Sequence, residues 1–442
     1  MTPEHEVVVV GGGFGGLLVA TELAARGRDV LLVDAAEAPG GVAATIEDDG
    51  FVLEPAAGTL LLPHPKLTPL LARAGVAVEP ASPSAGVRYV WTRGRLAAIP
   101  SSPKALITPA ISLRGKLRMA FEPFVRMPPP GEEESLHGFL TRRLGDEAGG
   151  LLAHVAASGV FAGDPRRLSA AAAFPGVVEL ERTGGSLARG AIRRLRAASR
   201  PRPPRPTSHL PVGGMATAAR TMAAALGDGY RASFPVAAVL PDEGAWRVEG
   251  PETLTAAAVV VALRPGDARA VLPTIVSELP DGWPSSPVAV VGIGGTAADV
   301  PLPEGFGFLT GPDVDAATVG CLFESSYAPR RAPEGCALAK AIVGGARRPD
   351  LADRSDADLV SVVVGDLERA LGVSVTPSWT RVVRHPEGIP HYDLGHRHRL
   401  SALDRIEAHH AGLVFAGWGY RGIGLAHLAA DAARVADRLE RR

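Results

Sequence analysis

The chain has 442 residues, of which 46% are hydrophobic, and its formal net charge is -1. A chain of this length exceeds the usual size of one hydrophobic core, so two or three lobes are expected. The near-neutral charge lacks the basic excess of a nucleic-acid-binding protein, and the cysteines, Cys321 and Cys336, form neither a metal cluster nor a disulfide framework.

The first residues lack the basic and apolar regions of a secretory signal. The longest apolar run, residues 256–263, is far shorter than the roughly 20 residues needed to cross a bilayer. We therefore expect a soluble or peripheral protein, in the cytoplasm or on the cytoplasmic face of the cell membrane.

A buried strand and a glycine-rich turn come first in the chain. The β-branched run 7–10 is typical of a parallel strand covered on both faces. It leads into a G-x-G-x-x-G pattern formed by Gly11, Gly13 and Gly16, and a helix is predicted at 17–26. The first glycine allows a tight turn, the second lets the backbone approach a pyrophosphate, and the third packs the helix against the strand. The helix N-terminus would then face the phosphates.

A second predicted strand, residues 30–33, ends in Asp34. An acidic residue at this point accepts hydrogen bonds from a ribose, whereas an NADP site would prefer a basic residue. The alternative is a glycine-rich turn without a ligand. Strand, turn, helix and acid together favour a dinucleotide site.

An amphipathic segment follows the first lobe. Its apolar positions are Leu113, Leu117, Phe121 and Phe124, and its basic ones are Arg114, Lys116 and Arg118. A basic amphipathic helix can lie in a membrane interface, or it can be an ordinary helix that packs on a cavity wall. Periodicity alone favours the second interpretation.

Proline-rich segments at 128–131 and 201–206 bracket a block of helix-forming composition. Helices are predicted there at 135–144, 146–155 and 186–199. Short strands are then predicted at 231–240, 245–248, 253–263, 288–292, 307–309, 318–323 and 337–343, with one helix near 356–371. A final strand at 412–417 precedes a glycine-rich turn and a helix from Leu425.

Three features resemble the FAD-binding amine oxidase superfamily. They are the Gly40-Gly41 pair after Asp34, the strand that ends in residues 262–268, and the terminal segment 417–424. The resemblance implies an α/β fold with a Rossmann-like, two-dinucleotide-binding-domain architecture and FAD as the cofactor. The FAD contacts it implies are Gly11, Gly13, Phe14, Gly16, Asp34, Gly40, Gly41, Val236, Gly417, Trp418, Gly422, Ile423 and Gly424.

Other segments resemble the protoporphyrinogen oxidase family, especially its bacterial oxygen-dependent form. These segments are 88–94, 159–164 with 168–169, 306–309, 343–346, 388–396 and 419–424. The resemblance implies an FAD-binding domain, a mixed α+β substrate-binding domain and a helical lobe that docks on membranes. The implied ranges are 1–65, 205–270 and 400–442 for the first, 66–98 and 271–399 for the second, and 99–204 for the lobe.

The same resemblance implies a reaction and a substrate site. Protoporphyrinogen IX would be oxidised to protoporphyrin IX in haem biosynthesis, by hydride transfer to the flavin N5, with O2 reoxidising the flavin. Arg88 matches an arginine that pairs with a propionate of the tetrapyrrole. Leu309 and Ile342 match apolar residues that hold the macrocycle, and Gly163 matches a backbone position near the reacting ring. No catalytic side chain is identified, because the cofactor carries the difficult step and the protein orients the substrate.

A metal site at the histidines of 391–398 is not expected, because they lie in a turn segment that is typical of the resembled family. The chain also departs from the family pattern. Residues 54–59 read Glu-Pro-Ala-Ala-Gly-Thr where Gly-Pro-Asn-Ser is common, and Trp418 stands where asparagine is usual. His385 replaces a frequent tryptophan, and His427 a frequent aspartate.

Several alternatives stay open at this point. Coproporphyrinogen III, with four carboxylates instead of two, would need a more basic cavity than Arg88 alone supplies. Amine oxidases of the superfamily place a lysine near the flavin N5, but Lys340 lies at an ordinary strand position. The altered terminal motif supports a third alternative, a flavoprotein that has lost turnover. The oligomeric state, a homodimer included, is left open.

Overall fold

A seven-stranded sheet carries the glycine-rich turn at the carboxyl end of its first strand. The computed structural model describes residues 3–99, 111–129, 131–197 and 204–441. The sheet order is β10-β2-β1-β13-β12-β11, and β19 also pairs with β13. Its strands are β1 (His5–Val10), β2 (Val30–Val33), β10 (Tyr230–Arg231), β11 (Ala238–Asp242), β12 (Ala245–Glu249), β13 (Thr253–Val261) and β19 (Leu413–Phe415). The neighbours of β1, which are β2 and β13, run parallel to it.

Helices cover both faces of this first sheet, which explains its continuous valine run. Val7 and Val9 face one core, and Val8 and Val10 face the other. The helices on the first side are α1 (Phe14–Ala25), α2 (Leu67–Arg73), α9 (Gly214–Ala225) and α14 (Leu425–Glu440). The helices on the second side are α10 (Pro265–Val271) and α13 (His396–His409). This layering confirms the predicted α/β class.

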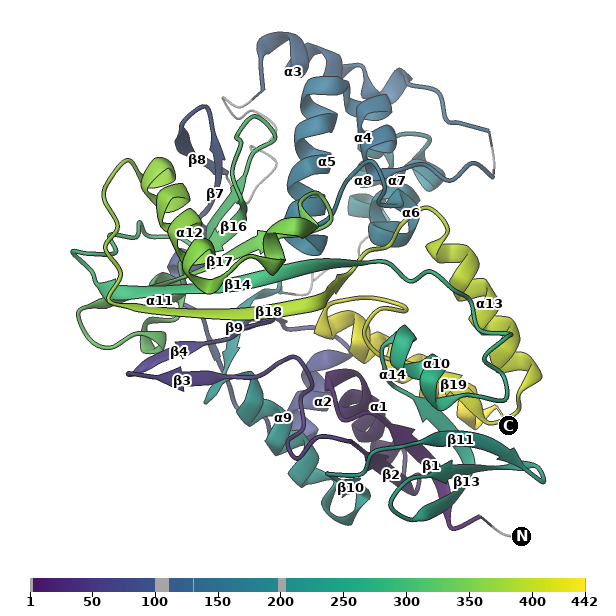
Figure 1. The fold of residues 1–442 in the computed structure, drawn as a ribbon. Helices are drawn as coiled ribbons and strands as arrows, with labels where there is room; N and C mark the ends of the chain where they lie inside the picture. Colours follow the sequence, from purple (N-terminus) through teal and green to yellow (C-terminus); the bar gives the residue numbers. More distant parts are fainter. Residues whose placement is uncertain (1–2, 100–110, 130, 198–203, 442) are drawn as a thin grey trace.

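A second seven-stranded sheet lies between the first sheet and a helical lobe (Figure 1). Its order is β18-β14-β17-β16-β15-β7-β8. Its strands are β7 (Arg88–Thr92), β8 (Arg95–Ile99), β14 (Ser285–Thr296), β15 (Gly307–Thr310), β16 (Thr318–Leu322), β17 (Cys336–Gly344) and β18 (Trp379–Pro390). Helix α12 (Asp356–Leu371) covers one face through Leu359, Val363 and Leu367. Phe51 and Leu53 of the first lobe and Gly159 of the helical lobe pack against the other face.

The helical lobe packs around a buried arginine. Its helices are α3 (Leu113–Ala120), α4 (Leu136–Leu144), α5 (Asp146–Phe161), α6 (Ala170–Ala173), α7 (Pro175–Gly184) and α8 (Leu187–Ala197). The side chain of Arg143 is fully buried and pairs with Glu181 and, at 3.3 Å, with Glu122. A buried charge needs such partners, so this cluster fixes α4 against α7.

Shorter elements join the lobes. The hairpin of β3 (Ile46–Asp48) and β4 (Phe51–Leu53) packs on the second sheet through Phe51 and Leu53. The remaining elements are β5 (Leu60–Leu62), β6 (Val78–Pro80), β9 (Thr207–Pro211), α11 (Glu324–Tyr327) and the 3-10 turns Pro83–Gly86, Glu122–Phe124, Gly227–Gly229, Pro329–Arg331 and Pro349–Asp353. No helix in the described ranges combines the length and the hydropathy needed to cross a bilayer.

Two sequence-based expectations about elements are wrong. The predicted strand 231–240 is broken, because β10 ends at Arg231 and β11 begins only at Ala238. The stripe from Leu113 to Phe124 does not pack on a cavity wall, because Leu113 and Phe124 are each 75% exposed. The domain ranges stay a prediction, and residues 201–203 of the second proline-rich segment lie outside the described chain.

Candidate cofactor and substrate site

The glycine-rich turn has the geometry that its residues predict. Gly11 has a φ of 111°, which only glycine adopts without strain, and a Cβ there would lie 2.8 Å from Ala262 O. A Cβ on Gly16 would collide with Gly11 O, so α1 can approach β1 only because this residue is glycine. A Cβ on Gly13 would meet no protein atom within 4 Å. Gly13 therefore borders open space.

Asp34 and the glycine pair close the far side of this turn. The carboxylate of Asp34 accepts hydrogen bonds from the backbone N–H of Gly12 and, at 2.7 Å, of Ala36. Gly40 has a φ of 118° and forms a parallel bridge with Gly13. The half-buried carboxylate is thereby fixed beside the turn, where a ribose hydroxyl could donate to it.

The terminal segment, residues 417–424, packs against the same glycine-rich turn. A Cβ on Gly15 would lie 2.6 Å from the Cα of Gly417, so the beginning of α1 packs directly on this segment. The indole Nε1 of Trp418 donates to Ile423 O at 3.0 Å. The N–H of Gly422 donates to the hydroxyl of Tyr392 at 2.7 Å. These contacts place the N-terminus of α14 next to that of α1.

A cavity of about 300 Å³ joins these parts. The predicted cofactor residues that line it are Gly11, Gly13, Phe14, Asp34, Gly40, Gly41, Trp418 and Ile423. Sequence reasoning missed other lining residues, which are Gly15, Val42, Ala43, Ala56, Ala57, Ala262, Leu263, Arg264, Asp267, Leu425 and Leu428. The lining fits FAD, because two helix N-termini favour the phosphates, Asp34 suits a ribose and much of the remaining wall is apolar.

Several predicted cofactor residues do not line this cavity but lie in the segments that form it. Gly16 and Gly417 lie beneath the turn, and Gly422 and Gly424 precede α14. Val236 is half-buried in the segment between β10 and β11. That segment begins beside the ribose-binding acid, because the N–H of Phe234 donates to Asp34 O at 2.7 Å.

The predicted apolar substrate residues share one face of the second sheet. Leu309 pairs with Gly320, and Gly320 pairs with Ile342 on the next strand. The row continues to Val290 on one side and to Val90 on the other. Directly paired residues point to the same side of a sheet. Leu309 and Ile342 are therefore on the face opposite α12, where the Leu309 side chain lies over Gly320 and against Gly159 of α5.

Arg88 lies on the same face, two residues before Val90 in β7. It is exposed, and its guanidinium lies 5.1 Å above the centre of the Phe306 ring. Gly163 follows helix α5, and a Cβ there would lie 3.1 Å from His391. It lines a cavity of about 120 Å³ with His154 and Arg347, and none of Arg88, Leu309 and Ile342 lines that cavity.

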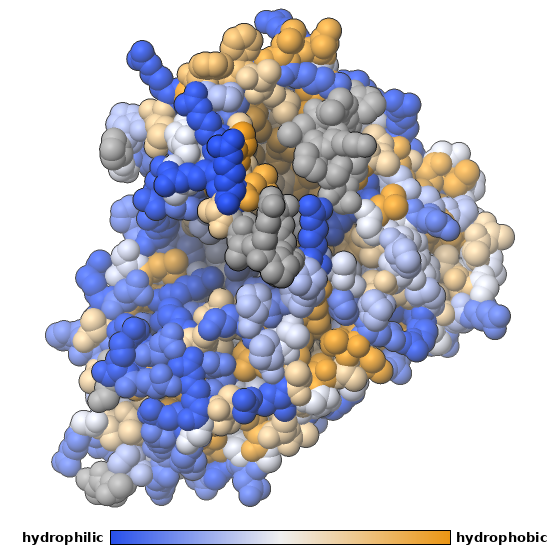
Figure 2. Space-filling model, turned by 180° about the vertical axis from the view of Figure 1, so that it is seen from behind, coloured by the Kyte–Doolittle hydropathy of each residue, from blue (hydrophilic) through white to orange (hydrophobic). Residues whose placement is uncertain are grey.

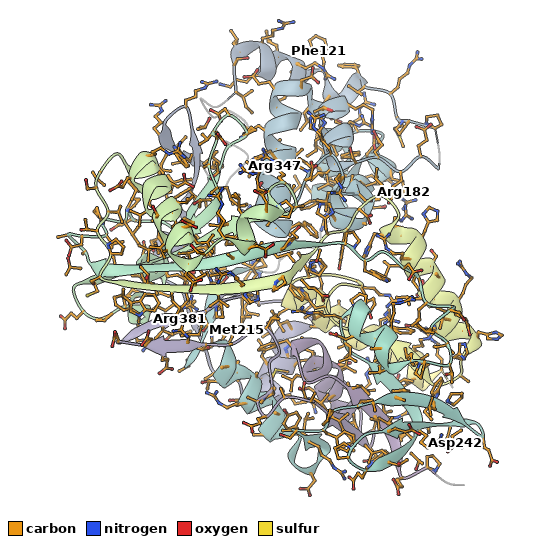
Figure 3. The ribbon with its side chains drawn as sticks, viewed as in Figure 1. Phe121, Arg182, Met215, Asp242, Arg347 and Arg381 are labelled. Atoms are coloured by element: carbon orange, nitrogen blue, oxygen red, sulfur yellow. The ribbon has the colours of Figure 1, made fainter. Side chains whose placement is uncertain are left out.

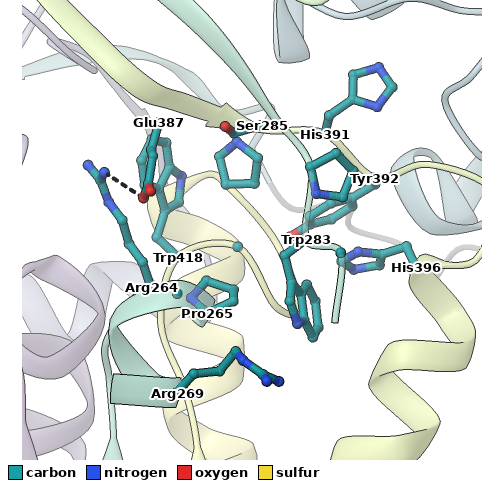
Figure 4. A pocket seen from close by; sticks show the side chains of 15 residues that line it. Arg264, Pro265, Arg269, Trp283, Ser285, Glu387, His391, Tyr392, His396 and Trp418 are labelled. Carbon is teal, nitrogen blue, oxygen red and sulfur yellow. Dashed lines mark ion pairs between the residues drawn. The ribbon is translucent and has the colours of Figure 1, made fainter. Parts of the chain in front are cut away.

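A further cavity of about 220 Å³ adjoins the cofactor cavity (Figure 4). Arg264 and Trp418 line both cavities, and Arg264 pairs with Glu387 at 3.6 Å while stacking 5.7 Å from the Trp418 ring. Beyond them lie His391 and His396. Burial lowers the pKa of both imidazoles, to about 4 for His396. His391 is within hydrogen-bonding distance of the Asp164 N–H and His396 of Tyr420 O, so protein groups hold both rings.

Lys340 is not at an ordinary strand position. Its side chain is only 3% exposed, and its ammonium group pairs with Glu324 at 2.8 Å. The ammonium also donates to backbone oxygens next to the cofactor cavity. A cation held in this way is not free to activate a water molecule for amine oxidation.

Known proteins match the chain over most of its length. The family described as flavin containing amine oxidoreductase matches residues 14–437. A chloroplastic protoporphyrinogen oxidase from Oryza sativa subsp. japonica is 31% identical, over 91% of this chain and 80% of the relative. Coproporphyrinogen III oxidase from Bacillus subtilis (strain 168) is 26% identical, over 96% of this chain and 95% of its own.

Solved structures show the same fold. A protein from Exiguobacterium sp. 255-15, provisionally assigned as a protoporphyrinogen oxidase, superposes with a TM-score of 0.79 at 22% identity, over 99% of each chain. Cyclohexylamine oxidase from Brevibacterium oxydans IH-35A gives a TM-score of 0.69 at 18% identity, over 99% of this chain and 100% of its own.

The chain belongs to the flavin containing amine oxidoreductase family. The predicted FAD cofactor and the predicted class, an FAD-dependent oxidoreductase, are confirmed. The two relatives described above are porphyrinogen oxidases by name, one named for protoporphyrinogen and the other for coproporphyrinogen III.

Proposed function

We propose that the chain oxidises protoporphyrinogen IX to protoporphyrin IX in haem biosynthesis, with O2 as the electron acceptor. The observation that carries this proposal is that the half-buried side chains of Leu309 and Ile342 share one face of the second sheet with Arg88. Apolar side chains edged by an arginine suit a macrocycle with propionates better than they suit a small charged amine. Relatives named protoporphyrinogen oxidase at 30% and 31% identity support the same reaction.

The protein residues have positioning tasks in this reaction. The flavin supplies the chemistry by accepting hydride from the substrate and passing electrons to O2. Leu309 and Ile342 would remove water from one face of the macrocycle and orient it. Arg88, at the edge of the same face, would pair with a propionate that stays ionised at neutral pH. The buried imidazoles of His391 and His396 favour their neutral forms, so they add no charge near the cofactor.

Coproporphyrinogen III is the second candidate substrate. The Bacillus subtilis relative with that specificity in its name matches 96% of this chain. Arg347 and Arg348 both line the small cavity that contains Gly163, and they would supply cations for additional carboxylates. The dicarboxylate remains our proposal because Arg88 lies on the same face as Leu309 and Ile342, whereas Arg347 and Arg348 line a separate cavity.

The experiment that separates the two substrates is a comparison of initial rates. Purified protein is mixed in air with each porphyrinogen, and porphyrin fluorescence is followed over time. We expect the larger kcat/KM for protoporphyrinogen IX. A clearly larger value for coproporphyrinogen III would make the tetracarboxylate the substrate.

We also propose that the helical lobe contacts the cytoplasmic face of the cell membrane. Apolar side chains gather at the helical end of the molecule (Figure 2), and Phe121 lies at its extremity (Figure 3). The exposed members of this apex surface are Leu113, Leu117, Phe121, Phe124 and Met127. Arg114 and Lys116 lie among them on α3. An apolar surface edged by cations suits an anionic lipid interface.

A further inference from the structure

The loop of residues 54–58 follows β4 and forms part of the cofactor cavity through Ala56 and Ala57. Its backbone oxygens are bound by side chains from the substrate-side elements. The ammonium group of Lys340 on β17 donates to Glu54 O at 2.9 Å and to Ala56 O at 3.2 Å. One buried cation therefore binds two carbonyls of the same loop.

Two other side chains bind the backbone oxygens of Pro55 and Gly58 in the same loop. The imidazole Nε2 of His385 on β18 lies 2.9 Å from Pro55 O, to which it donates. The guanidinium of Arg331 donates to Gly58 O at 2.6 Å. Burial lowers the pKa of His385, so the neutral ring is favoured and its Nε2 carries the proton that this bond needs. The oxygens of residues 54, 55, 56 and 58 are thus all held from the side of the second sheet.

A buried carboxylate holds the two cations in place. Glu324 is fully buried and pairs with Lys340 at 2.8 Å and with Arg331. Burial alone would raise the pKa of Glu324, but the charges of Lys340 and Arg331 outweigh it and hold this pKa at about 2. Removing charges from water is costly, and apolar residues of similar volume often serve stability equally well. Stability alone therefore does not account for three charged residues at these buried positions.

The orientation of the loop follows from peptide geometry. In a trans peptide the N–H of one residue points opposite to the C=O of the residue before it. Since the oxygens of Pro55 and Ala56 point to the second sheet, the N–H groups of Ala56 and Ala57 point away from it, and both residues line the cavity. Within the described chain, no protein group accepts from these two N–H groups. Pro55 has no N–H and leaves no further donor.

We propose that Lys340, Arg331 and His385 are positioning residues that turn the Ala56 and Ala57 N–H groups toward the flavin, with Glu324 fixing the two cations. Donors fixed in advance stabilise charge that develops during a reaction, because they need no reorganisation. Accepting a hydride leaves negative charge on the flavin, so this loop would favour the reduced cofactor over the oxidised one. The proposal holds for either porphyrinogen, because it concerns only the cofactor.

The test is a redox titration of the full-length holoprotein with a dye reference and no porphyrinogen. In Lys340→Met we expect the preference for reduced flavin to fall about tenfold, which lowers the midpoint potential by about 30 mV for a two-electron couple. We also expect FAD affinity to fall by at least tenfold in a fluorescence titration. Lys340→Arg keeps the charge and should recover part of both values.

Arg143→Met is the matched control, because Arg143 is equally buried and ion-paired but lies in the helical lobe. Both variants should lose thermal stability, and only Lys340→Met should change the flavin potential. If Lys340→Met fails to fold, His385→Phe removes one donor and should still lower the potential, by a smaller amount. A potential and an FAD affinity equal to the wild-type values in the folded variant would show that the cluster serves stability alone. Absence of porphyrin formation by the wild-type protein would instead count against the proposed function.

Discussion

At the scale of single residues, the space and the charges around the cofactor cavity lead to testable predictions. Replacing Gly13 by valine should abolish FAD retention, because the side chain would enter open space that no protein atom occupies. The variant should still fold, because the Cβ at this position would meet no protein atom within 4 Å. The measurement is the ratio of flavin to protein absorbance after purification.

Gly150→Val provides the control for this substitution, since a Cβ there also meets no atom within 4 Å but lies in α5. It should retain a full complement of flavin. A normal flavin content in Gly13→Val would mean that the glycine-rich turn does not hold the pyrophosphate.

Arg88 tests the orientation of the substrate. A charge-assisted hydrogen bond contributes roughly 1.5–3 kcal/mol, and the exposure of Arg88 in the free protein favours the lower end. Arg88→Ala should therefore raise KM about tenfold, at 1.4 kcal/mol per factor of ten, with little change in kcat, because the propionate lies away from the reacting carbon.

Arg88→Lys should recover part of this loss, since lysine keeps the charge but not the planar fork. FAD content should stay constant in both variants. An unchanged KM in Arg88→Ala would identify Arg88 as an ordinary surface residue, and the orientation proposed for the macrocycle would be wrong.

At the scale of elements, helix α3 tests the membrane proposal. Leu117 is 58% exposed and Phe121 is 62% exposed, so replacing both by aspartate removes apolar surface without opening a core. The double variant should no longer sediment with anionic vesicles, while its melting temperature should stay within a few degrees of the wild-type value. Retained sedimentation would show that the apex surface is not the contact.

Helix α13 begins with a histidine that should make stability depend on pH. Burial lowers the pKa of His396 to about 4, whereas an unfolded histidine has a pKa near 6.5. Between these values the unfolded chain binds a proton that the folded protein does not. The free energy of unfolding is therefore unaffected by His396 above pH 6.5 and falls as the pH falls toward 4. His396 alone should cost about 2 kcal/mol of unfolding free energy between pH 7 and pH 5.

Urea unfolding of the wild-type protein and of His396→Gln at these two pH values measures the effect. The variant should show a smaller fall in unfolding free energy, and His398→Gln, at an exposed position of the same helix, should behave like the wild type. An equal fall in unfolding free energy from pH 7 to pH 5 in all three proteins would contradict a buried neutral imidazole at His396.

At the scale of the whole molecule, the sequence predicted the elements with strong periodicity or fixed motif spacing. The turn at Gly11, the acid at Asp34 and helix α12 are such cases. Strand β18 was not predicted because it is an edge strand beside β14 whose burial does not alternate: Trp379 and Gly388 are its buried residues, and most others are exposed or half-buried.

The arrangement around the 54–58 loop could not be predicted, for a different physical reason. Lys340 and Glu54 are 286 residues apart, and neither has a local pattern that points to the other. Such contacts arise only when the second sheet docks on the first lobe. The same limit applies to Leu309 and Ile342, whose common face follows from strand register and not from spacing.

The central claim, that this flavoprotein takes electrons from a porphyrinogen, is tested most directly by one anaerobic single-turnover measurement. The holoprotein is mixed with excess protoporphyrinogen IX in a stopped-flow cell, and the visible flavin absorption is followed. We expect the flavin absorption to bleach and then to recover when O2 is admitted, with porphyrin fluorescence appearing. A flavin that stays oxidised in the presence of both protoporphyrinogen IX and coproporphyrinogen III would contradict the proposed function.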